Sequence, residues 1–571
     1  MTAVRLFLLS VILCICALDM EANEWLFKDG YSDYTIVIAN DASVSERTAA
    51  REFQSIVRQV SGAELPITLQ PTRKSVYIGW TAESGEVKPA VEDEAFTYKT
   101  IGCNLFIYGG CERGTMYGVF AFLERELGVH WYTSDYTKVP KMKQYELGAL
   151  NHTERPVITS RLDYYSDAVS HNDWASHNLI NNRLFPAYTK YGHMTASWGT
   201  HSFSRLIPPA VYFKEHPEYF GVYKGKRHHN TQLCLSNEEM CKELIKNLEK
   251  VIQEKSDYWC YDVSQNDNNF YCECVKCQQL TLRYGGHSGL MVWFVNKVAH
   301  EIKKVYPDVM IGTFAYHYTR QAPASDIRPA DNVVIKLCDI ECCMAHPLDE
   351  CEQNKEFLRD MENWRRITKN IYIWDYTTGF RHYLMPFPNF DVLARNYQYF
   401  SRSNVIGILE LGSWNAPWSE FSELKQWLVA KLLWNPKQNT DSLATLFIKD
   451  YYGTSASYVR KYYDLCRRQI KPNTHFTVSI EWNIDLYTDK YISDADKLLK
   501  KAVAVCHDKE TLKRTNRLAA QIYYLQLRRH TIHSIINGTA SKLKEIIKND
   551  STVVREHNGS IDQLINDLSY Y

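Results

Sequence analysis

The spacing of hydrophobic residues between about 24 and 150 changes repeatedly from that of strands to that of helices. Three runs rich in β-branched and aromatic residues predict strands: Tyr34–Ala39, Val76–Trp80 and Phe96–Tyr108, the last broken into a pair near residue 102. Helical spacing covers Glu46–Val60 and Gly114–Leu127. Strands interleaved with two helices predict a small α/β domain over residues 24–150, with its sheet covered on one side.

Residues 155–435 alternate strand-like runs with helical stretches such as Met240–Glu254 and Met291–Val305. The strand-like runs are Ile158–Tyr164, Tyr258–Ser264, Val309–Tyr316, Val333–Leu337, Ile371–Tyr376 and Val405–Leu411. A series of β–α units of this length predicts a (β/α)8-type barrel. The pattern shows six strands rather than eight, which leaves an incomplete or distorted barrel open.

Residues 440–571 carry stronger helix signals, above all in Ala495–Val505 and Thr511–His530. This region predicts a helical C-terminal domain. The fold class is therefore α/β: a (β/α)8-type barrel preceded by a small α/β domain and followed by a helical domain.

Residues 1–22 predict an export signal. An early positive charge precedes the apolar run Leu6–Leu18, which is too short to cross a bilayer as a mature helix. Cleavage is expected after Ala17 or Ala22, while Cys14 and Cys16 leave lipidation open as the alternative. We expect an exported protein, in the periplasm or at the cell surface, that meets a membrane only through such a lipid anchor.

Charge and composition narrow the class of partner. Lys+Arg and Asp+Glu both number 66, so no basic excess is present to neutralise phosphates, and a nucleic-acid partner is disfavoured. The chain also lacks a glycine-rich phosphate loop in the required context. Its 39 Tyr, 22 Phe and 14 Trp suit the apolar faces of sugar rings, although aromatic residues also fill cores.

Acidic, amide and aromatic side chains recur where the predicted barrel strands end, which is where such barrels carry their reactive groups. Glu410 follows an apolar strand, where desolvation would raise the pKa of its carboxyl as a general acid requires. The pair Asn266-Asp267 follows another strand and is placed to orient a 2-acetamido group, which then attacks its own anomeric carbon. Predicted substrate contacts at the same ends are Trp374, Asp375, Tyr376, Trp414, Asn415 and His317.

Each candidate has a structural alternative. Glu410 is equally placed to pair with a structural arginine, and the run Asn266–Asn269 favours an Asx turn. Each tryptophan alone is more often part of a core than a sugar platform.

We predict no cofactor and no catalytic metal. Cys272, Cys274 and Cys277 have a spacing that suits zinc only if a fourth ligand, Cys260 or a histidine, folds in. A disulfide or a buried thiol cluster competes with this structural zinc site in an exported protein. The stretch Cys338–His346 is a second possible metal-binding pattern. The favoured interpretation is a barrel strand and loop whose thiols are packed in the core.

Two sets of motifs resemble known carbohydrate-active families. Tyr34–Ala39, Val76–Trp80 and Gly114–Glu124 resemble the domain that precedes the barrel in α-glucuronidases and family 20 hexosaminidases. Ser264–Cys277, with Pro217–Phe220 and Ile371–Tyr376, resembles an exported bacterial family, formerly a domain of unknown function, whose members founded glycoside hydrolase family 163. The resemblance covers roughly residues 30–435.

The resemblance implies an endo-β-N-acetylglucosaminidase that cuts the chitobiose core of complex N-glycans by a retaining, substrate-assisted mechanism. On this chain the resemblance implies that Glu410 is the general acid/base. Asp267, together with Asn266, would then orient the acetamido group, and the reverse assignment of these two roles stays open. The expected partner is a glycan or glycoprotein. Alternatives are an exo-glycosidase of α-glucuronidase or hexosaminidase type, and a non-catalytic glycan-binding protein on a barrel scaffold.

Overall fold

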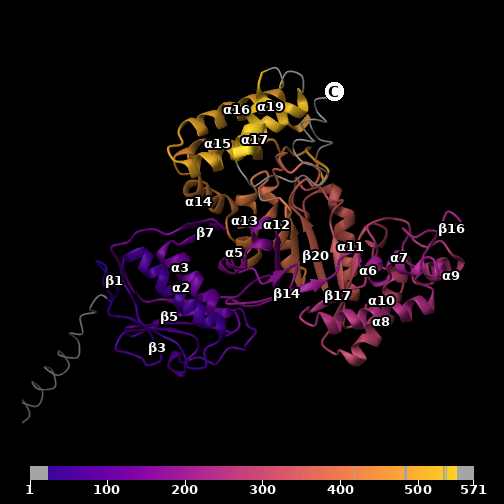
Figure 1. Cartoon of the computed structure of the whole chain (residues 1–571), viewed down its shortest axis with the longest axis horizontal. Coiled ribbons are helices and arrows are strands. Elements are labelled where there is room, and N and C mark those ends of the chain that lie inside the picture. The colour runs from indigo at the N-terminus through magenta and orange to yellow at the C-terminus, as the bar shows by residue number, and fades with distance from the viewer. Residues whose placement is uncertain (1–23, 417, 481–484, 531–533, 535–536, 550–571) are drawn as a thin grey trace, which may run out of the picture. The chain divides into compact units, whose positions relative to one another are not determined.

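The computed structural model describes residues 24–416, 418–480, 485–530, 534 and 537–549 (Figure 1). The predicted signal peptide, residues 1–22, lies outside them. The chain forms two compact units. The first comprises the residues up to Trp131 with Thr137–Arg155 and Tyr188–His193, and the second comprises Tyr132–Tyr136, Pro156–Ala187 and the chain from Met194 onward. None of the helices among the described residues is long and apolar enough to span a membrane.

The first unit contains a six-stranded sheet in the order β10-β5-β6-β4-β2-β3. Its strands are β2 (Thr35–Val37), β3 (Ile67–Thr68), β4 (Ser75–Ile78), β5 (Phe96–Ile101), β6 (Asn104–Gly109) and β10 (Asn151–Glu154). Helices α2 (Val44–Ser61) and α3 (Gly114–Leu127) pack against each other and against this sheet. The predicted strands and both predicted helices of this region are confirmed.

The start of α2 is fixed by its own sequence. Ser43 accepts a hydrogen bond from the Glu46 amide, and the Glu46 carboxylate accepts one from the Ser43 amide at 2.9 Å. This capping box satisfies two donors that a helix N-terminus otherwise leaves free. Gly62, at a φ of 83°, ends the helix in the left-handed conformation that glycine adopts without steric cost.

The second unit is built on eight strands in the order β11-β21-β20-β19-β18-β17-β14-β12, all paired in parallel. They are β11 (Ser160–Tyr164), β12 (Asn182–Arg183), β14 (Gly192–Trp198, which belongs to this unit from Met194 onward), β17 (Cys260–Asp262), β18 (Met310–Ala315), β19 (Val333–Cys338), β20 (Ile371–Tyr376) and β21 (Gly407–Leu411). Helices α8 (Glu238–Glu254), α10 (His287–Val305), α11 (Lys355–Ile367), α12 (Phe390–Arg402) and α13 (Ser422–Trp434) surround them (Figure 1). The predicted (β/α)8-type barrel is confirmed.

The structure supplies the two strands that the hydrophobic pattern did not reveal. β12 is only two residues long, so it leaves no periodic signal. β14 alternates buried Met194, Ala196 and Trp198 with polar or small residues, and it has no aliphatic run. The barrel is nearly closed: Asn181 Oδ1 accepts from the Arg161 amide at 2.8 Å and Asn182 Nδ2 donates to Ser160 Oγ at 2.7 Å, so side chains bridge β11 and β12.

The twofold alternation of each barrel strand decides which side chains face the barrel interior. Leu162, Cys260, Val334, Tyr372 and Leu409 form the inner apolar cluster. The residues two positions further along β20 and β21, Trp374 and Leu411, therefore point inward as well, whereas their neighbours point to the helix layer.

Above this apolar layer lies a buried ion pair. Lys336 Nζ is 2.6 Å from Asp262 Oδ1, and both side chains are almost fully buried. Gly312 lies between them on the intervening strand, where an added Cβ would come within 2.3 Å of Asp262 Oδ1. Only glycine leaves room for the pair at this position.

The C-terminal region is helical, as predicted, and belongs to the same compact unit as the barrel. Helices α15 (Ala456–Arg467), α16 (Asp489–Ala504), α17 (Lys509–Arg529) and α19 (Thr539–Asn549) pack in sequence order after α14 (Thr440–Tyr452) (Figure 1).

Candidate functional site

A cleft of about 220 Å³ opens at the carboxyl ends of the barrel strands. Its walls are mostly aromatic, with one carboxylate and one imidazole. The lining residues are His201, Asp267, Phe314, Tyr316, Cys338, Ile340, Trp374, Tyr376, Phe380, Leu411 and Trp414. Of the residues predicted from sequence, the structure brings Asp267, Trp374, Tyr376 and Trp414 together here.

Asp267 is the single carboxylate among the residues that line this cleft in the described part of the chain. Its side chain is exposed, and Tyr316 donates its hydroxyl hydrogen to Asp267 Oδ1 at 3.1 Å. Burial and the Asp267 charge together raise the pKa of Tyr316, so the phenol stays neutral and remains a donor. The pair presents an oriented carboxylate to the cleft.

Asn266 supports Asp267 from behind rather than lining the cleft. Its amide nitrogen donates to the Thr231 carbonyl at 3.2 Å, and its amide oxygen accepts from the Ser204 backbone at 3.1 Å. The buried Gln232 side chain then holds the Asn266 backbone at both ends, accepting from its N–H and donating to its carbonyl, each at 2.8 Å. The loop that carries Asp267 is therefore fixed by amide hydrogen bonds.

Two histidines at strand ends have a strained backbone. His201 has a φ of 53° and His317 a φ of 49°, in the left-handed region that residues other than glycine rarely occupy. His201 Nδ1 lies 2.7 Å from the Gln265 carbonyl, which can only accept, so Nδ1 carries the proton. His317 does not line the cleft, and it pairs with Glu341 at 2.9 Å.

The aromatic walls form a connected set. Phe314 and Trp374 meet edge to face with ring centroids 5.3 Å apart, and Tyr164 and Trp414 lie 5.5 Å apart. Trp414 keeps 39% of its surface exposed, so part of this residue remains accessible to a ligand. Asn415 is turned away from this wall and accepts from the Tyr383 hydroxyl at 2.8 Å.

Glu410 and Asp375 lie behind the cleft wall, in the layer between the strands and the helices. Their registered positions on β21 and β20 are adjacent, and both side chains are buried. Glu410 Oε2 accepts from the Tyr397 hydroxyl of α12 at 2.7 Å. Neither residue lines the cleft, because each follows an inward-facing residue on its strand.

Glu410 and Asp375 belong to a cluster of buried carboxyls that also includes Asp163 and Asp339. Burial, and then the neighbouring Asp375, raise the pKa values of Glu410 and Asp339 well above their usual range. Burial raises the pKa of Asp375 to about 6. No arginine or lysine pairs with Glu410 among the described ion pairs, so burial beside other carboxyls favours the neutral form of this carboxyl.

Asp375 is expected to make the protein less stable as the pH rises. Its folded pKa of about 6 exceeds the unfolded value of about 3.9, so the folded state binds more protons between these pH values. Stability is therefore greatest below pH 4 with respect to this group and falls as the pH rises through 6. We expect the free energy of unfolding to differ less between pH 4 and pH 7 in Asp375→Asn than in the unsubstituted chain, by about 2 kcal/mol, as measured by chemical denaturation.

The exposed Asp308, substituted in Asp308→Asn, is the control for that measurement, and we expect its pH dependence to match the unsubstituted chain. An unchanged pH dependence in Asp375→Asn would show that Asp375 does not titrate with a raised pKa.

Most of the cleft walls were not predicted from the sequence. His201, Phe314, Tyr316, Cys338, Ile340, Phe380 and Leu411 line the cleft and were not predicted. Phe314 and Tyr316 had a usable signal, since the alternation along their strand places both on the inward face. His201 had none, because the strand before it was not recognised.

The three cysteines whose spacing left a zinc site open come together with a partner that the sequence did not suggest. Cys272, Cys274 and Cys277 gather with Cys234, while Cys260 lies in β17 and belongs to the inner barrel cluster. A second group joins Cys343, His346, Cys351 and His475. Neither group lines the cleft.

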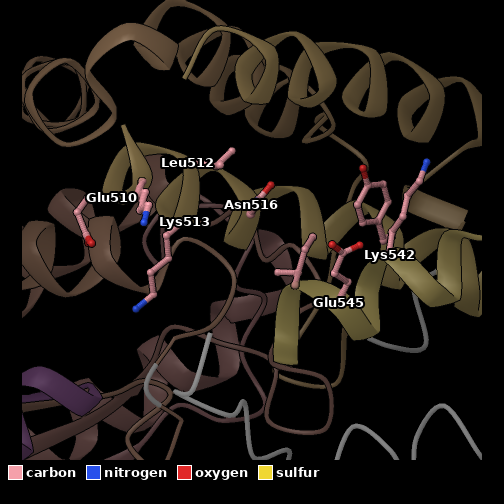
Figure 2. Close-up of a pocket in the computed structure, with 9 residues that line it drawn as sticks. Glu510, Leu512, Lys513, Asn516, Lys542 and Glu545 are labelled. Atoms are coloured by element: carbon pink, nitrogen blue, oxygen red, sulfur yellow. The ribbon is translucent and has the colours of Figure 1, made fainter. Parts of the chain in front are cut away.

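Another cavity, of about 460 Å³, lies in the helical region between α17 and α19 (Figure 2). It is lined by charged residues, including Glu510, Lys513, Lys542 and Glu545. Figure 2 shows Lys513 and Lys542 extending in opposite directions, so their charges do not converge on one ligand position. The aromatic cleft at the strand ends is the better candidate site.

Comparison with known proteins supports the fold. A family model described as "Domain of unknown function (DUF4838)" matches residues 131–464. No curated protein sequence matches the chain. The chain is similar to the structure of a GH115 4-O-methyl-α-glucuronidase, BtGH115A, described as specific for decorated arabinogalactans, with 12% identity and a TM-score of 0.57 over 91% of this chain and 76% of that one. At this identity the likeness shows a shared fold.

A second similar structure is the chitobiase FjGH20 of Flavobacterium johnsoniae, with 10% identity and a TM-score of 0.47 over 92% of this chain and 93% of that one. At that TM-score it carries no argument about the site.

Proposed function

We propose, from the premise that this chain belongs to the DUF4838 family, that it is a glycoside hydrolase acting on a 2-acetamido sugar. The observation that carries the proposal is the cleft at the carboxyl ends of the strands, with aromatic walls and a single oriented carboxylate, Asp267. Aromatic faces suit the apolar faces of sugar rings, and strand ends are where (β/α)8 barrels place their chemistry. The fold shared with a glycoside hydrolase of family GH115 is consistent with this class.

One carboxylate in the cleft favours a substrate-assisted mechanism. Most glycosidases need two carboxyls that flank the scissile bond. Where the substrate carries a 2-acetamido group, its carbonyl oxygen attacks the anomeric carbon instead, and the leaving-group oxygen takes a proton from a general acid, the role predicted for Glu410, as the glycosidic bond breaks. Water then attacks the anomeric carbon of the resulting oxazolinium ion, gives its proton to the same group acting as base, and opens the ring with retention of configuration. In this scheme Asp267 orients and polarises the acetamido N–H, and Tyr316 holds Asp267 in place.

The substrate class follows from the resemblance to glycoside hydrolase family 163. We propose an endo-β-N-acetylglucosaminidase that releases N-glycans from glycoproteins outside the cell, in keeping with the predicted export signal. The assignment of Glu410 as general acid stays a prediction from its strand-end position, because its carboxyl is buried behind the cleft wall in this structure.

Mass spectrometry of a glycoprotein digest tests the proposal. We expect a free glycan that retains one N-acetylglucosamine at its reducing end, one N-acetylglucosamine left on the protein, and inhibition by a thiazoline analogue of the oxazoline. Release of single sugars from aryl glycosides instead would indicate an exo-glycosidase. Glycan binding without any product, unchanged in Asp267→Asn, would indicate a non-catalytic binding protein.

Trp414→Ala is expected to weaken substrate binding. Loss of the indole removes apolar contact with the sugar worth about 1–2 kcal/mol, so KM should rise roughly tenfold while kcat changes little. Trp80→Ala, in the other compact unit, is the matched control and should leave KM unchanged. An unaltered KM in Trp414→Ala would remove this residue from the substrate contacts.

A further inference from the structure

Four cysteines meet beside the loop that carries Asp267. Cys234, Cys272 and Cys277 are buried and Cys274 is partly exposed, and their sulfur atoms all lie within 4.8 Å of one another. The Sγ atom of Cys234 is 3.7 Å from that of Cys274 and 3.9 Å from that of Cys277. Four sulfurs at the corners of a tetrahedron with Zn–S bonds of about 2.3 Å are about 3.8 Å apart. We propose that these four cysteines bind a structural zinc ion.

The backbone around the cluster is arranged for thiolate ligands. The Val222 amide donates to Cys272 Sγ at 3.4 Å, and such N–H···S bonds stabilise negative charge on sulfur. Cys274 lies at the N-cap of α9 (Val275–Arg283), where the helix dipole favours an anion. Gly221 allows the chain to pass close to Cys272, since an added Cβ would come within 3.2 Å of the Cys272 backbone.

The four-cysteine cluster ties two loops together. Cys234 comes from the segment before α8, and the other three come from the segment between β17 and α9 and from α9 itself. Gln232, two residues before Cys234, holds the backbone of Asn266 next to Asp267. The segment that follows β17 carries Asp267 near its start and Cys272 near its end. Gln232 holds it beside Asp267, and a zinc ion would hold it at Cys272.

A second cluster, with its own geometry, carries the same inference independently. Cys343, His346, Cys351 and His475 have ligand atoms that lie within 4.8 Å of one another. His475 Nδ1 is 3.3 Å from Cys343 Sγ and 3.7 Å from Cys351 Sγ, and His346 Nδ1 is 3.7 Å from Cys343 Sγ. Zinc bonds of about 2.3 Å to sulfur and about 2.05 Å to nitrogen give tetrahedral S···N edges of about 3.6 Å.

The tautomer of His346 is already set for metal binding. Its Nε2 lies 3.1 Å from the Lys471 carbonyl, which can only accept, so Nε2 carries the proton and Nδ1 presents its lone pair to the cluster. The Asn354 side chain holds the backbone of Cys343 at both ends. Its Oδ1 accepts from the Cys343 N–H at 2.7 Å, and its Nδ2 donates to the Cys343 carbonyl at 3.2 Å. The geometry points to a second structural zinc ion.

The site of two cysteines and two histidines would cross-link distant parts of the barrel unit. Three ligands follow β19, whereas His475 lies between α15 and α16, 124 residues beyond Cys351. The structure joins the same segments by a backbone hydrogen bond from Met344 to Phe476 at 2.8 Å. A metal ion that binds only the folded chain would stabilise it and hold the helical region to the loop after β19.

Elemental analysis and native mass spectrometry of the full chain, purified without chelator, test both sites. We expect two zinc ions per chain. Cys274→Ser and His475→Ala should each lose one ion, and a chain carrying both changes should lose two. Cys506→Ser, a partly exposed cysteine outside both clusters, should keep two.

Cobalt exchange gives a readout that does not depend on the variants folding. The unsubstituted chain refolded with Co²⁺ should show the intense visible bands of tetrahedral cobalt bound by thiolates. Alkylation under denaturing conditions should find every cysteine of the two clusters as a free thiol. A zinc-free chain, iron in place of zinc, or disulfides among the cluster cysteines would each overturn the proposal, whatever the outcome of the glycosidase assays.

Discussion

Asp267→Asn is expected to lower kcat/KM for a 2-acetamido glycoside by about 10²–10³-fold, the usual cost of removing one group that stabilises developing charge. Asn keeps the size of the side chain and its acceptor for Tyr316, so the fold and the cleft shape should persist. What is lost is the negative charge that faces the acetamido N–H. Initial rates with a defined glycopeptide, together with circular dichroism, separate a loss of activity from a loss of structure.

Asp257→Asn is the matched control for that substitution. Asp257 is exposed and precedes β17 at the opposite end of the same strand, so its removal should leave kcat/KM unchanged. Equal rates for Asp267→Asn and the unsubstituted chain would remove Asp267 from the mechanism.

Glu410→Gln in the same assay decides the role of that residue. A loss of kcat with unchanged stability would show that the Glu410 carboxyl supplies a proton to the substrate. Retained turnover would place Glu410 in the buried support behind the cleft, where Gln preserves the hydrogen bond from Tyr397.

Lys336→Met is expected to destabilise the barrel by about 3–5 kcal/mol near neutral pH. The substitution keeps the length of the side chain but leaves the Asp262 carboxylate buried without its cation. The pKa of Asp262, already raised by burial, should then rise further. Because the folded pKa exceeds the unfolded one, the deficit should be largest at pH 7 and should shrink as the pH falls toward 4. Thermal unfolding monitored at both pH values measures it.

Two further chains control this experiment. Lys242→Met removes an exposed ion pair with Glu239 and should change stability by less than about 1 kcal/mol. Asp262→Leu combined with Lys336→Met removes both buried charges and should recover part of the loss. A Lys336→Met chain as stable as the unsubstituted one at pH 7 would contradict the assigned role of the ion pair.

Periodic hydrophobic runs predicted those parts of the fold that have a strong local signal. The helices near Glu46–Val60 and Gly114–Leu127 were found because their apolar residues recur at helical spacing and each helix ends at a glycine. Six barrel strands were found because β-branched, aliphatic or aromatic residues predominate in each run. β12 and β14 were missed because pairing with neighbouring strands, rather than local hydrophobicity, makes them part of the sheet.

The candidate site could be predicted only in part, for a related reason. Strand ends could be read from the sequence, and four of the residues chosen there, Asp267, Trp374, Tyr376 and Trp414, line the cleft. Which side of the wall a strand-end residue faces depends on the register of the finished barrel. A shift of one residue moves a side chain such as Glu410 from the cleft to the helix layer.

The amino-acid sequence by itself determined the class of fold, the order of its parts and the general position of the site, because these follow from local periodicity and from turn and cap residues. Only the tertiary structure decided that Cys234 joins Cys272, Cys274 and Cys277, that His475 joins the loop after β19, and that Glu410 is enclosed. These contacts join residues far apart in the chain. Their geometry is set by strand pairing and helix packing, which no local pattern in the sequence specifies.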